Sequence, residues 1–371
     1  MWYAVAGCED TKETVGNMWV KVALVLFVSC LSSVAQGFGR REAMRPWLQG
    51  RFPEAEREFA LREAQLPRSG WLLLCEAEFE IERARYGRAA ALVKRARDFM
   101  TADTEGSAER RLARVMLSVG RFSEAWHLAL EGRRWDGKDV QTLKGMYPMD
   151  LVTIGEVCLA RGEFSKAIAV LESGRDRAKK VSSLYGVEWV RAQDDIAVAD
   201  LSLGRAQAAS QAATLALSAA ESEWGPRSIP AMDALDTLGL VQLSESRFRD
   251  AETSLSQSRV WREALYGTQH PKVAASYLHA SLLSAGQMDS DGALRLMRRG
   301  LEIEKSLAVS GPNGRWALAV LSGAELFSQT GQIDSARDCY ENAVPVLERE
   351  LGPDAPRLKD ARQRAAGLGA N

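Results

Sequence analysis

A short phrase that recurs eight times constrains the fold of this chain more than any other feature. It consists of a small residue, any residue, an aromatic or apolar residue, two further positions and then alanine, as in the segment from Gly162 through Phe164 to Ala167. The closing alanines are Ala55, Ala89, Ala125, Ala167, Ala209, Ala251, Ala293 and Ala336. They lie 34, 36, 42, 42, 42, 42 and 43 residues apart. Such a regular interval indicates stacked structural repeats.

Each residue type in the phrase has a mechanical role in a pair of helices. Glycine ends the first helix because it adopts the left-handed conformation at low cost. The aromatic residue opens the second helix. Alanine three positions later shares its face, where a small side chain lets two backbones approach closely. Another small position stands seven residues before the phrase, at Gly155, Ala197, Gly239 and Ser281. Strand-like alternation is scarce, so the sequence predicts helix hairpins throughout.

These residues resemble the tetratricopeptide repeat, and the copies over roughly residues 130–360 resemble the 42-residue variety of kinesin light chains and many bacterial proteins. That variety has a Gly-x-x-His-Pro connector, present here from Gly267 to His270 and Pro271. The resemblance covers about residues 40–360. It implies an all-α, right-handed α-solenoid of about eight helix-turn-helix repeats with a concave inner surface. The segment Arg357–Gly367 is expected to form a C-terminal capping helix.

Two details of the repeat lead to more local expectations. Going from 34 to 42 residues adds about one turn to each helix of a pair. In the seventh copy, Gly286 and Met288 stand two residues too early relative to Ala293. We therefore expect a local insertion and a longer turn at Asp289–Gly292.

The N-terminus has the pattern of an export signal. Lys21 precedes an apolar stretch from Val22 to Val28, and small residues follow up to Ala35. The pattern fits best if translation begins at Met18. We expect residues 1–35 to be an N-terminal extension plus signal peptide or signal anchor, and residues 36–371 to be the solenoid. The protein would then be periplasmic or secreted. A buried first helix in a cytoplasmic protein and a lipid anchor on Cys30 are the alternatives.

Charge and motifs argue against several classes of function. The chain has 48 basic and 49 acidic side chains. This balance gives no long-range attraction to nucleic acid. Cys75, Cys158 and Cys339 lie far apart among apolar residues, which favours buried thiols over disulfides. No histidine has metal-ligand spacing, and His270 and His279 are interpreted as structural. No nucleophile-and-base set or phosphate-binding loop is evident, so we expect no enzyme activity, cofactor or metal.

The resemblance also indicates which side chains face the groove. In this family, positions on the first helix of each pair tend to meet the ligand. Aligned on the glycine of each phrase, those positions hold Arg110, Arg111, Arg114, Glu156, Arg191, Asp194, Asp195, Asp233 and Asp236, with Tyr277 as an aromatic candidate. The groove would run from a basic entrance to an acidic middle and could orient an extended peptide. The alternative is that these charges only keep a helix face soluble.

The sequence therefore predicts a non-enzymatic scaffold that binds a peptide or a partner's helix in its concave groove. A self-assembling solenoid is one alternative, because repeat arrays expose an apolar face at each end. An intracellular adaptor like kinesin light chain is another. Those proteins have a heptad coiled coil before the repeats, whereas residues 1–45 show none.

Overall fold

The computed structural model describes residues 44–368 except 101, 131–134, 136–138, 182–185 and 309–310. Every regular element in this part of the chain is helical, and it includes no strand. The predicted export signal, residues 1–35, lies outside the described residues. None of the described helices is both long enough and apolar enough to span a membrane.

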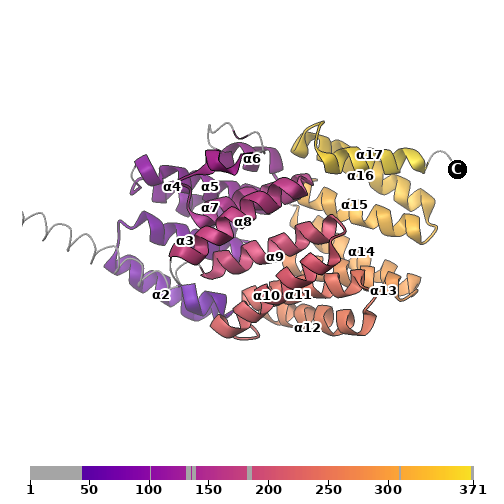
Figure 1. The fold of residues 1–371 in the computed structure, drawn as a ribbon, viewed down its shortest axis with the longest axis horizontal. Helices are drawn as coiled ribbons and strands as arrows, with labels where there is room; N and C mark the ends of the chain where they lie inside the picture. Colours follow the sequence, from indigo (N-terminus) through magenta and orange to yellow (C-terminus); the bar gives the residue numbers. More distant parts are fainter. Residues whose placement is uncertain are drawn as a thin grey trace, which may run out of the picture.

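The helices form eight antiparallel hairpins and a final single helix, so the predicted right-handed α-solenoid and its C-terminal helix are confirmed (Figure 1). Residues 44–48 are helical and pair with α2. The bounds are α2 Phe52–Gln65, α3 Gly70–Glu82, α4 Tyr86–Arg97, α5 Ala102–Ser118, α6 Phe122–Leu130, η1 Val140–Leu143, α7 Pro148–Arg161, α8 Phe164–Val181, α9 Gly186–Ser202, α10 Ala206–Trp224, α11 Ile229–Ser244, α12 Phe248–Tyr266, α13 Pro271–Gly286, α14 Ser290–Leu307, α15 Gly314–Gln329, α16 Ile333–Leu351 and α17 Pro356–Gly367.

The recurring phrase has the same geometry in all eight hairpins. Its closing alanine is completely buried each time. Its first residue has a positive φ each time, at Gly50, Ala84, Gly120, Gly162, Gly204, Ser246, Met288 and Gly331. This left-handed residue turns the chain between the two helices, and the buried alanine lets them pack closely. The period read from the sequence is therefore the period of the structure.

The longer turn expected in the seventh repeat is wrong. Helix α13 ends at Gly286 and α14 begins at Ser290, a gap of the same length as that between α11 and α12. Met288 takes the left-handed position with φ 66°. Its side chain is 91% exposed, so it meets no neighbour there. The repeat has no insertion and has methionine where most of the others have glycine.

The extra residues of the longer repeats go mainly into the second helix. Helices α8, α10, α12, α14 and α16 have 18 or 19 residues, whereas α2 has 14 and α4 has 12. First helices change less, from 13 residues in α3 to 14–17 in the later repeats. The 42-residue interval from Ala125 to Ala167 is long for another reason. Helix α6 has only 9 residues, and η1 lies in the connector between α6 and α7.

The solenoid makes a full turn and closes on itself. The backbone N–H of Gly314 donates to the carbonyl of Gly120 over 2.8 Å. The Arg161 guanidinium donates to the carbonyl of Leu351 over 2.9 Å. Near the other end, His270 Nε2 lies 3.0 Å from the carbonyl oxygen of Glu82. Each contact joins residues about 190 positions apart, so the first four repeats lie against the last four.

Apolar side chains reinforce this closure. Trp47 and Phe59 of the first repeat share a buried cluster with Ile229 and Met232 of α11. Phe122 of α6 packs into the cluster of the last helix pair, α15 and α16, which also contains Leu358 of α17. Helix α17 thus covers the apolar face of the eighth repeat. Buried apolar area is the main stabilising term of a fold, so the closure is part of the core.

Closure can be tested at Gly314. A Cβ added there would come 2.5 Å from the Phe122 ring and 2.7 Å from the carbonyl oxygen of Gly120. We expect Gly314→Ala to lower the free energy of unfolding by about 1–2 kcal/mol, because the ring and the backbone must both shift. Gly87→Ala is the control, since a Cβ at this helical glycine meets no described atom within 4 Å. Urea denaturation should find Gly87→Ala as stable as the wild type or slightly more stable. Equal effects from the two substitutions would contradict the closure.

Candidate functional site

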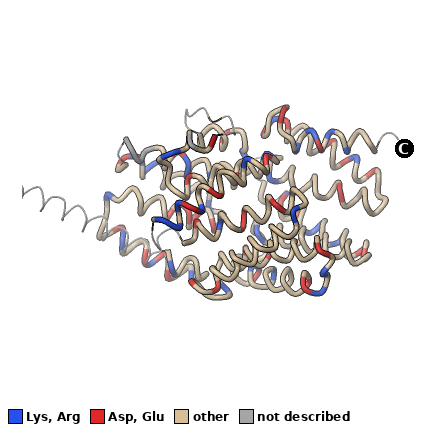
Figure 2. The backbone as a smooth tube through the Cα atoms, viewed as in Figure 1, with Lys and Arg blue, Asp and Glu red and all other residues tan. Residues whose placement is uncertain are grey.

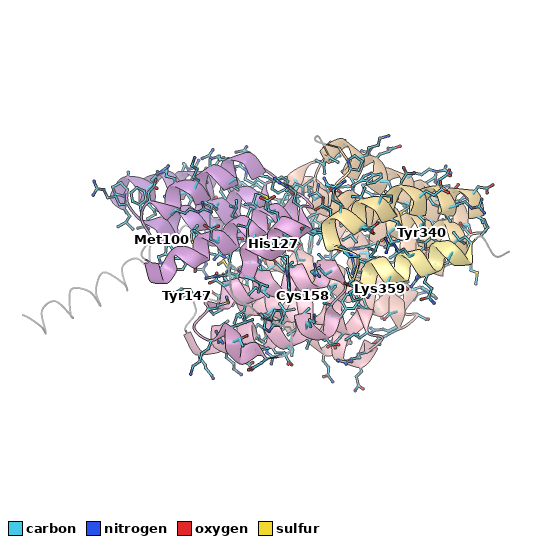
Figure 3. The ribbon with its side chains drawn as sticks, turned by 90° about the horizontal axis from the view of Figure 1, so that it is seen from above. Met100, His127, Tyr147, Cys158, Tyr340 and Lys359 are labelled. Atoms are coloured by element: carbon cyan, nitrogen blue, oxygen red, sulfur yellow. The ribbon has the colours of Figure 1, made fainter. Side chains whose placement is uncertain are left out.

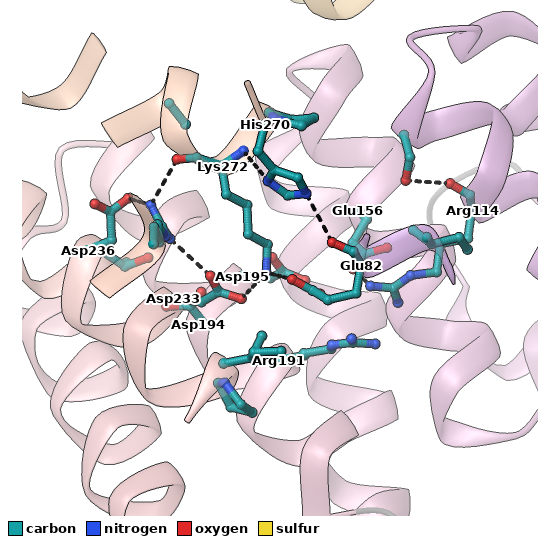
Figure 4. A pocket seen from close by; sticks show the side chains of 18 of the residues that line it. Glu82, Arg114, Glu156, Arg191, Asp194, Asp195, Asp233, Asp236, His270 and Lys272 are labelled. Carbon is teal, nitrogen blue, oxygen red and sulfur yellow. Dashed lines mark hydrogen bonds and ion pairs between the residues drawn. The ribbon is translucent and has the colours of Figure 1, made fainter. Parts of the chain in front are cut away.

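A cavity of about 390 Å³ occupies the concave side of the solenoid. Most of its wall comes from the first helices α3, α5, α7, α9, α11 and α13, with one contribution each from α4, α12 and α15 (Figure 4). Because the solenoid closes on itself, the expected open trough is a bounded pocket that repeats from both halves of the chain surround. Its lining is mixed, with apolar side chains such as Val190 and Ile229 beside many charged ones.

Seven of the ten predicted groove residues line this pocket. They are Arg114, Glu156, Arg191, Asp194, Asp195, Asp233 and Asp236. Arg110 and Arg111 lie outside it and are almost fully buried. Arg110 pairs with Asp150 at 2.9 Å and Arg111 with Glu78 at 3.1 Å. These two arginines join neighbouring repeats, so they form no basic entrance.

Tyr277 is also outside the pocket lining, and the misread turn of the seventh repeat explains why. Counting from Gly286 places Tyr277 at a groove position. Counting from Met288, the residue that is left-handed, moves the groove positions two residues on and selects Ala275 and His279. Both of these line the pocket. Tyr277 instead packs beside α12, where the Arg259 guanidinium lies 5.4 Å from the centre of its ring.

One group of paired charges is centred on Glu78 of α3. Its carboxylate lies 3.1 Å from the Arg111 guanidinium, 3.0 Å from that of Arg114 and 3.5 Å from that of Arg191. Arg114 also pairs with Glu156 at 3.2 Å. Burial by itself would raise the pKa of Glu78, but the surrounding guanidiniums hold that pKa below its usual value. This one carboxylate ties α3 to α5 and α9.

A second group is centred on Arg262 of α12. Its guanidinium pairs with Asp233 and Asp236 of α11 at 2.9 Å each. Lys272 adds a pair to Asp233 at 2.7 Å, and His279 Nδ1 lies 2.7 Å from Asp236. Although burial opposes ionisation, Lys272 and Arg262 hold the pKa of Asp233 below its usual value, and Arg262, with the hydrogen bond to His279, does the same for Asp236. Asp233 and Asp236 are therefore charged, and cations of the chain itself already accompany them.

His270 links the second group to the end of α3, across the closed solenoid. Its Nδ1 accepts from the backbone N–H of Lys272, so Nε2 carries the proton and donates to the carbonyl of Glu82. The Glu82 carboxylate pairs with Lys272 at 2.7 Å and accepts from the Tyr266 hydroxyl. Burial lowers the pKa of His270 to about 4, so the ring is neutral at physiological pH and joins the two segments through its hydrogen bonds. Its structural interpretation therefore agrees with these contacts.

Asp194 and Asp195 of α9 differ from the other carboxyls of the pocket. No basic group of the described residues is within ion-pair distance of either one. Asp194 Oδ1 and Asp195 Oδ2 are buried and have no hydrogen-bond partner among those residues. Burial, with Asp233 nearby, raises the pKa of Asp194 to about 7. Burial and the neighbouring Glu156 raise the pKa of Asp195 well above its usual value. The centre of the pocket therefore has two carboxyls without a cation.

Sequence reasoning misses several lining residues, for different reasons. Glu82 lies near the end of a first helix. The same alignment would have selected its position in the second repeat, but none of the ten predicted residues comes from that repeat. Arg262 comes from a second helix, so no groove position indicates it. His279 has no metal-ligand partner nearby in sequence, which favours a structural role. Its partner Asp236 lies 43 residues earlier in the chain, on the groove-facing first helix of the preceding repeat.

The structure gives no sign of metal or thiol chemistry in the residues it describes. They include no group of three or more His, Cys, Asp or Glu side chains placed to hold a metal ion. Among the described residues, Cys75, Cys158 and Cys339 form no disulfide. Burial raises the pKa of Cys158 to about 12 and that of Cys339 to about 11, so both thiols are protonated. Cys158 lies among the packed helices (Figure 3). Basic and acidic residues are interspersed along the helices (Figure 2).

No family model and no curated protein matches the sequence. Solved structures do match the fold. The Rap protein complexed with Competence and Sporulation Factor has a TM-score of 0.53 at 13% identity, over 89% of this chain and 98% of that one. The apo form of RapI has a TM-score of 0.50 at 13% identity, over 76% and 98%. The Cut9–Hcn1 hetero-tetramer of the APC/C has a TM-score of 0.52 at 14% identity, over 86% and 57%. With the eight uniform hairpins, these likenesses show that the chain has the fold of the tetratricopeptide-type repeat solenoids.

Proposed function

We propose that this protein is a non-enzymatic scaffold that binds a peptide or an extended segment of a partner protein in the central pocket. One observation carries the proposal: buried carboxyl oxygens in the pocket have no partner in the described part of the chain. Unsatisfied buried polar groups cost free energy, so a protein retains them where a ligand completes them. The fold supports this function, because one similar structure is that of a Rap protein in complex with a factor.

The shape of the site favours a narrow ligand. A cavity of about 390 Å³ suits a few side chains and cannot hold a folded domain. Its walls are held by ion pairs between repeats, so the site is largely preformed. A preformed site loses less conformational entropy on binding than a flexible one. A short segment that inserts one or two side chains fits these dimensions.

A random-peptide display selection tests the proposal, because it samples peptide ligands of widely varied sequence. Ala275 of α13 lines the pocket, and Ala275→Phe should fill part of it. We expect peptides enriched on the wild type to lose binding to Ala275→Phe. They should still bind Ala208→Phe, which adds the same ring on the exposed side of α10. Circular dichroism checks that both variants are folded. Enriched peptides that bind Ala275→Phe and the wild type equally would overturn the proposal, and so would a selection that enriches none.

A further inference from the structure

The two aspartates without a cation specify the chemistry of the ligand. Each other carboxylate in the centre of the pocket already has a cation: Arg114 for Glu156, and Arg262 for Asp233 and Asp236. Asp194 and Asp195 are adjacent on α9 and have none within ion-pair distance among the described residues. Asp236 adds a further oxygen to the pocket, since its side chain is only 6% exposed and its Oδ1 lacks a described hydrogen-bond partner. Among the lining atoms without a described hydrogen-bond partner, four are carboxyl oxygens, on Glu156, Asp194, Asp195 and Asp236, and two are guanidinium nitrogens, on Arg114 and Arg262, so acceptors outnumber donors.

The pocket lining also has an apolar part, which lies beside the carboxyls. Val190 stands four residues before Asp194, and Ile229 stands four residues before Asp233. In a helix this spacing puts the two side chains on one face, about one turn or 5.4 Å apart. All four of these residues line the pocket. Aliphatic side chains therefore lie one turn before the carboxyls on two neighbouring helices, α9 and α11.

We propose that the pocket binds a basic side chain of the partner segment, a lysine or an arginine, with its cationic head on the carboxylates of Asp194 and Asp195. Its aliphatic stem would lie along Val190 and Ile229. This inference rests on the function proposed above and names the chemical class of its ligand. Burying a cation there supplies the missing donors and restores the charge balance at the centre of the pocket.

A metal ion fits the site less well than an organic cation. Hard divalent cations take six or more oxygen ligands, or several waters held by carboxylates in a fixed geometry. Two carboxyls beside an aliphatic wall do not provide that shell, and the described residues form no group of metal-binding size. An ammonium or guanidinium group needs only acceptors on its polar end and apolar contact along its stem.

Binding should depend on pH, because a cation seated on the pair requires it to be ionised. The pKa of Asp194 is raised to about 7 by burial and by Asp233. The charged and titratable groups that line the pocket with the pair are Glu82 of α3, Tyr86 of α4, Arg114 of α5, Glu156 of α7, Arg191 of α9, Asp233 and Asp236 of α11, Arg262 of α12, His270 just before α13, Lys272 and His279 of α13, and Arg315 of α15. A cation added to this set displaces a proton. Affinity should therefore rise about tenfold between pH 6 and pH 8.

Calorimetric titration of the full chain with two pairs of small probes tests the inference. The first pair is Nα-acetyl-arginine amide and its neutral isostere Nα-acetyl-citrulline amide. The second is Nα-acetyl-lysine amide and Nα-acetyl-glutamine amide. We expect at least one cationic probe to bind about tenfold or more tightly than its neutral partner at pH 8. Asp194→Asn and Asp195→Asn should each weaken that binding about tenfold or more. Asp334→Asn, at a carboxylate that is 96% exposed, should leave it unchanged.

Several outcomes would overturn the inference: equal binding of charged and neutral probes, retained affinity in both Asn variants, or displacement of the probes by millimolar Mg²⁺ or Ca²⁺. Because His279 also lines the pocket and contacts Asp236, the pH profile is repeated in His279→Gln, where the rise in affinity should persist. The display selection separates the two proposals. Peptides that require an open pocket but contain no necessary Lys or Arg would leave the scaffold function intact and contradict the cationic ligand. Peptides indifferent to Ala275→Phe contradict the scaffold function itself.

Discussion

Replacing Glu78 with glutamine should destabilise the protein by about 3–5 kcal/mol, because three guanidiniums would lose the carboxylate that they share. Glu78 is 2% exposed and pairs with Arg111, Arg114 and Arg191. Glutamine has nearly the same shape, so the substitution leaves no cavity and changes mainly the charge. Breaking one side of a buried ion pair leaves its partner charged and poorly solvated. Here the effect spans α3, α5 and α9, so urea denaturation should show one cooperative transition at lower denaturant concentration.

Glu56→Gln is the matched control for this prediction. Glu56 also pairs with two arginines, Arg83 and Arg85, but its side chain is 45% exposed. Water solvates an exposed pair in both the folded and the unfolded state, so the loss should be about 0–1 kcal/mol. If Glu78→Gln is as mild as Glu56→Gln, the network around Glu78 does not hold the second, third and fifth repeats together.

The sequence is sufficient for the repeat itself, because the determinants of a helix hairpin are local. A left-handed residue and an alanine five positions later recur in every hairpin, so period and helix pairing follow from spacing. Met288 shows the limit of this reasoning: the left-handed position tolerates a methionine whose side chain points into solvent, and residue type alone does not reveal it. One misread turn then moves the predicted groove position from His279 to Tyr277.

The closed pocket could not be predicted in the same way. Whether Gly314 meets Gly120 depends on the small rotation of each repeat relative to the next, summed over five repeats. No residue pattern in the sequence predicts that sum. Whether a charged groove residue has an ion-pair partner depends on that closure and on side chains from the second helices. Arg262 neutralises Asp233 and Asp236 from a second helix, while the groove register places Asp194 and Asp195 where no such arginine reaches. Identical residue types at equivalent positions thus have different roles.

Asp194→Asn should make the protein more stable at pH 8, although it removes a proposed ligand-binding group. The pKa of Asp194 is about 7 in the folded chain, against about 3.9 when the chain is unfolded. The folded state therefore binds more protons than the unfolded state between these values, and the wild type loses stability from this group as pH rises through 7. Asparagine does not ionise, so the variant avoids this loss and can still accept the hydrogen bond of Thr237.

The stability difference between Asp194→Asn and the wild type should grow by about 2.5 kcal/mol from pH 5 to pH 8. Guanidinium denaturation of both proteins at the two pH values measures it, and groups common to both cancel in the comparison. Asp250→Asn, at an exposed aspartate paired with Arg247, should show no such growth. A wild type that is the more stable protein at pH 8 would mean that Asp194 is already satisfied within the chain. A gain in stability from removing Asp194 instead identifies a carboxyl kept at a cost to folding, as expected of a residue retained for a ligand.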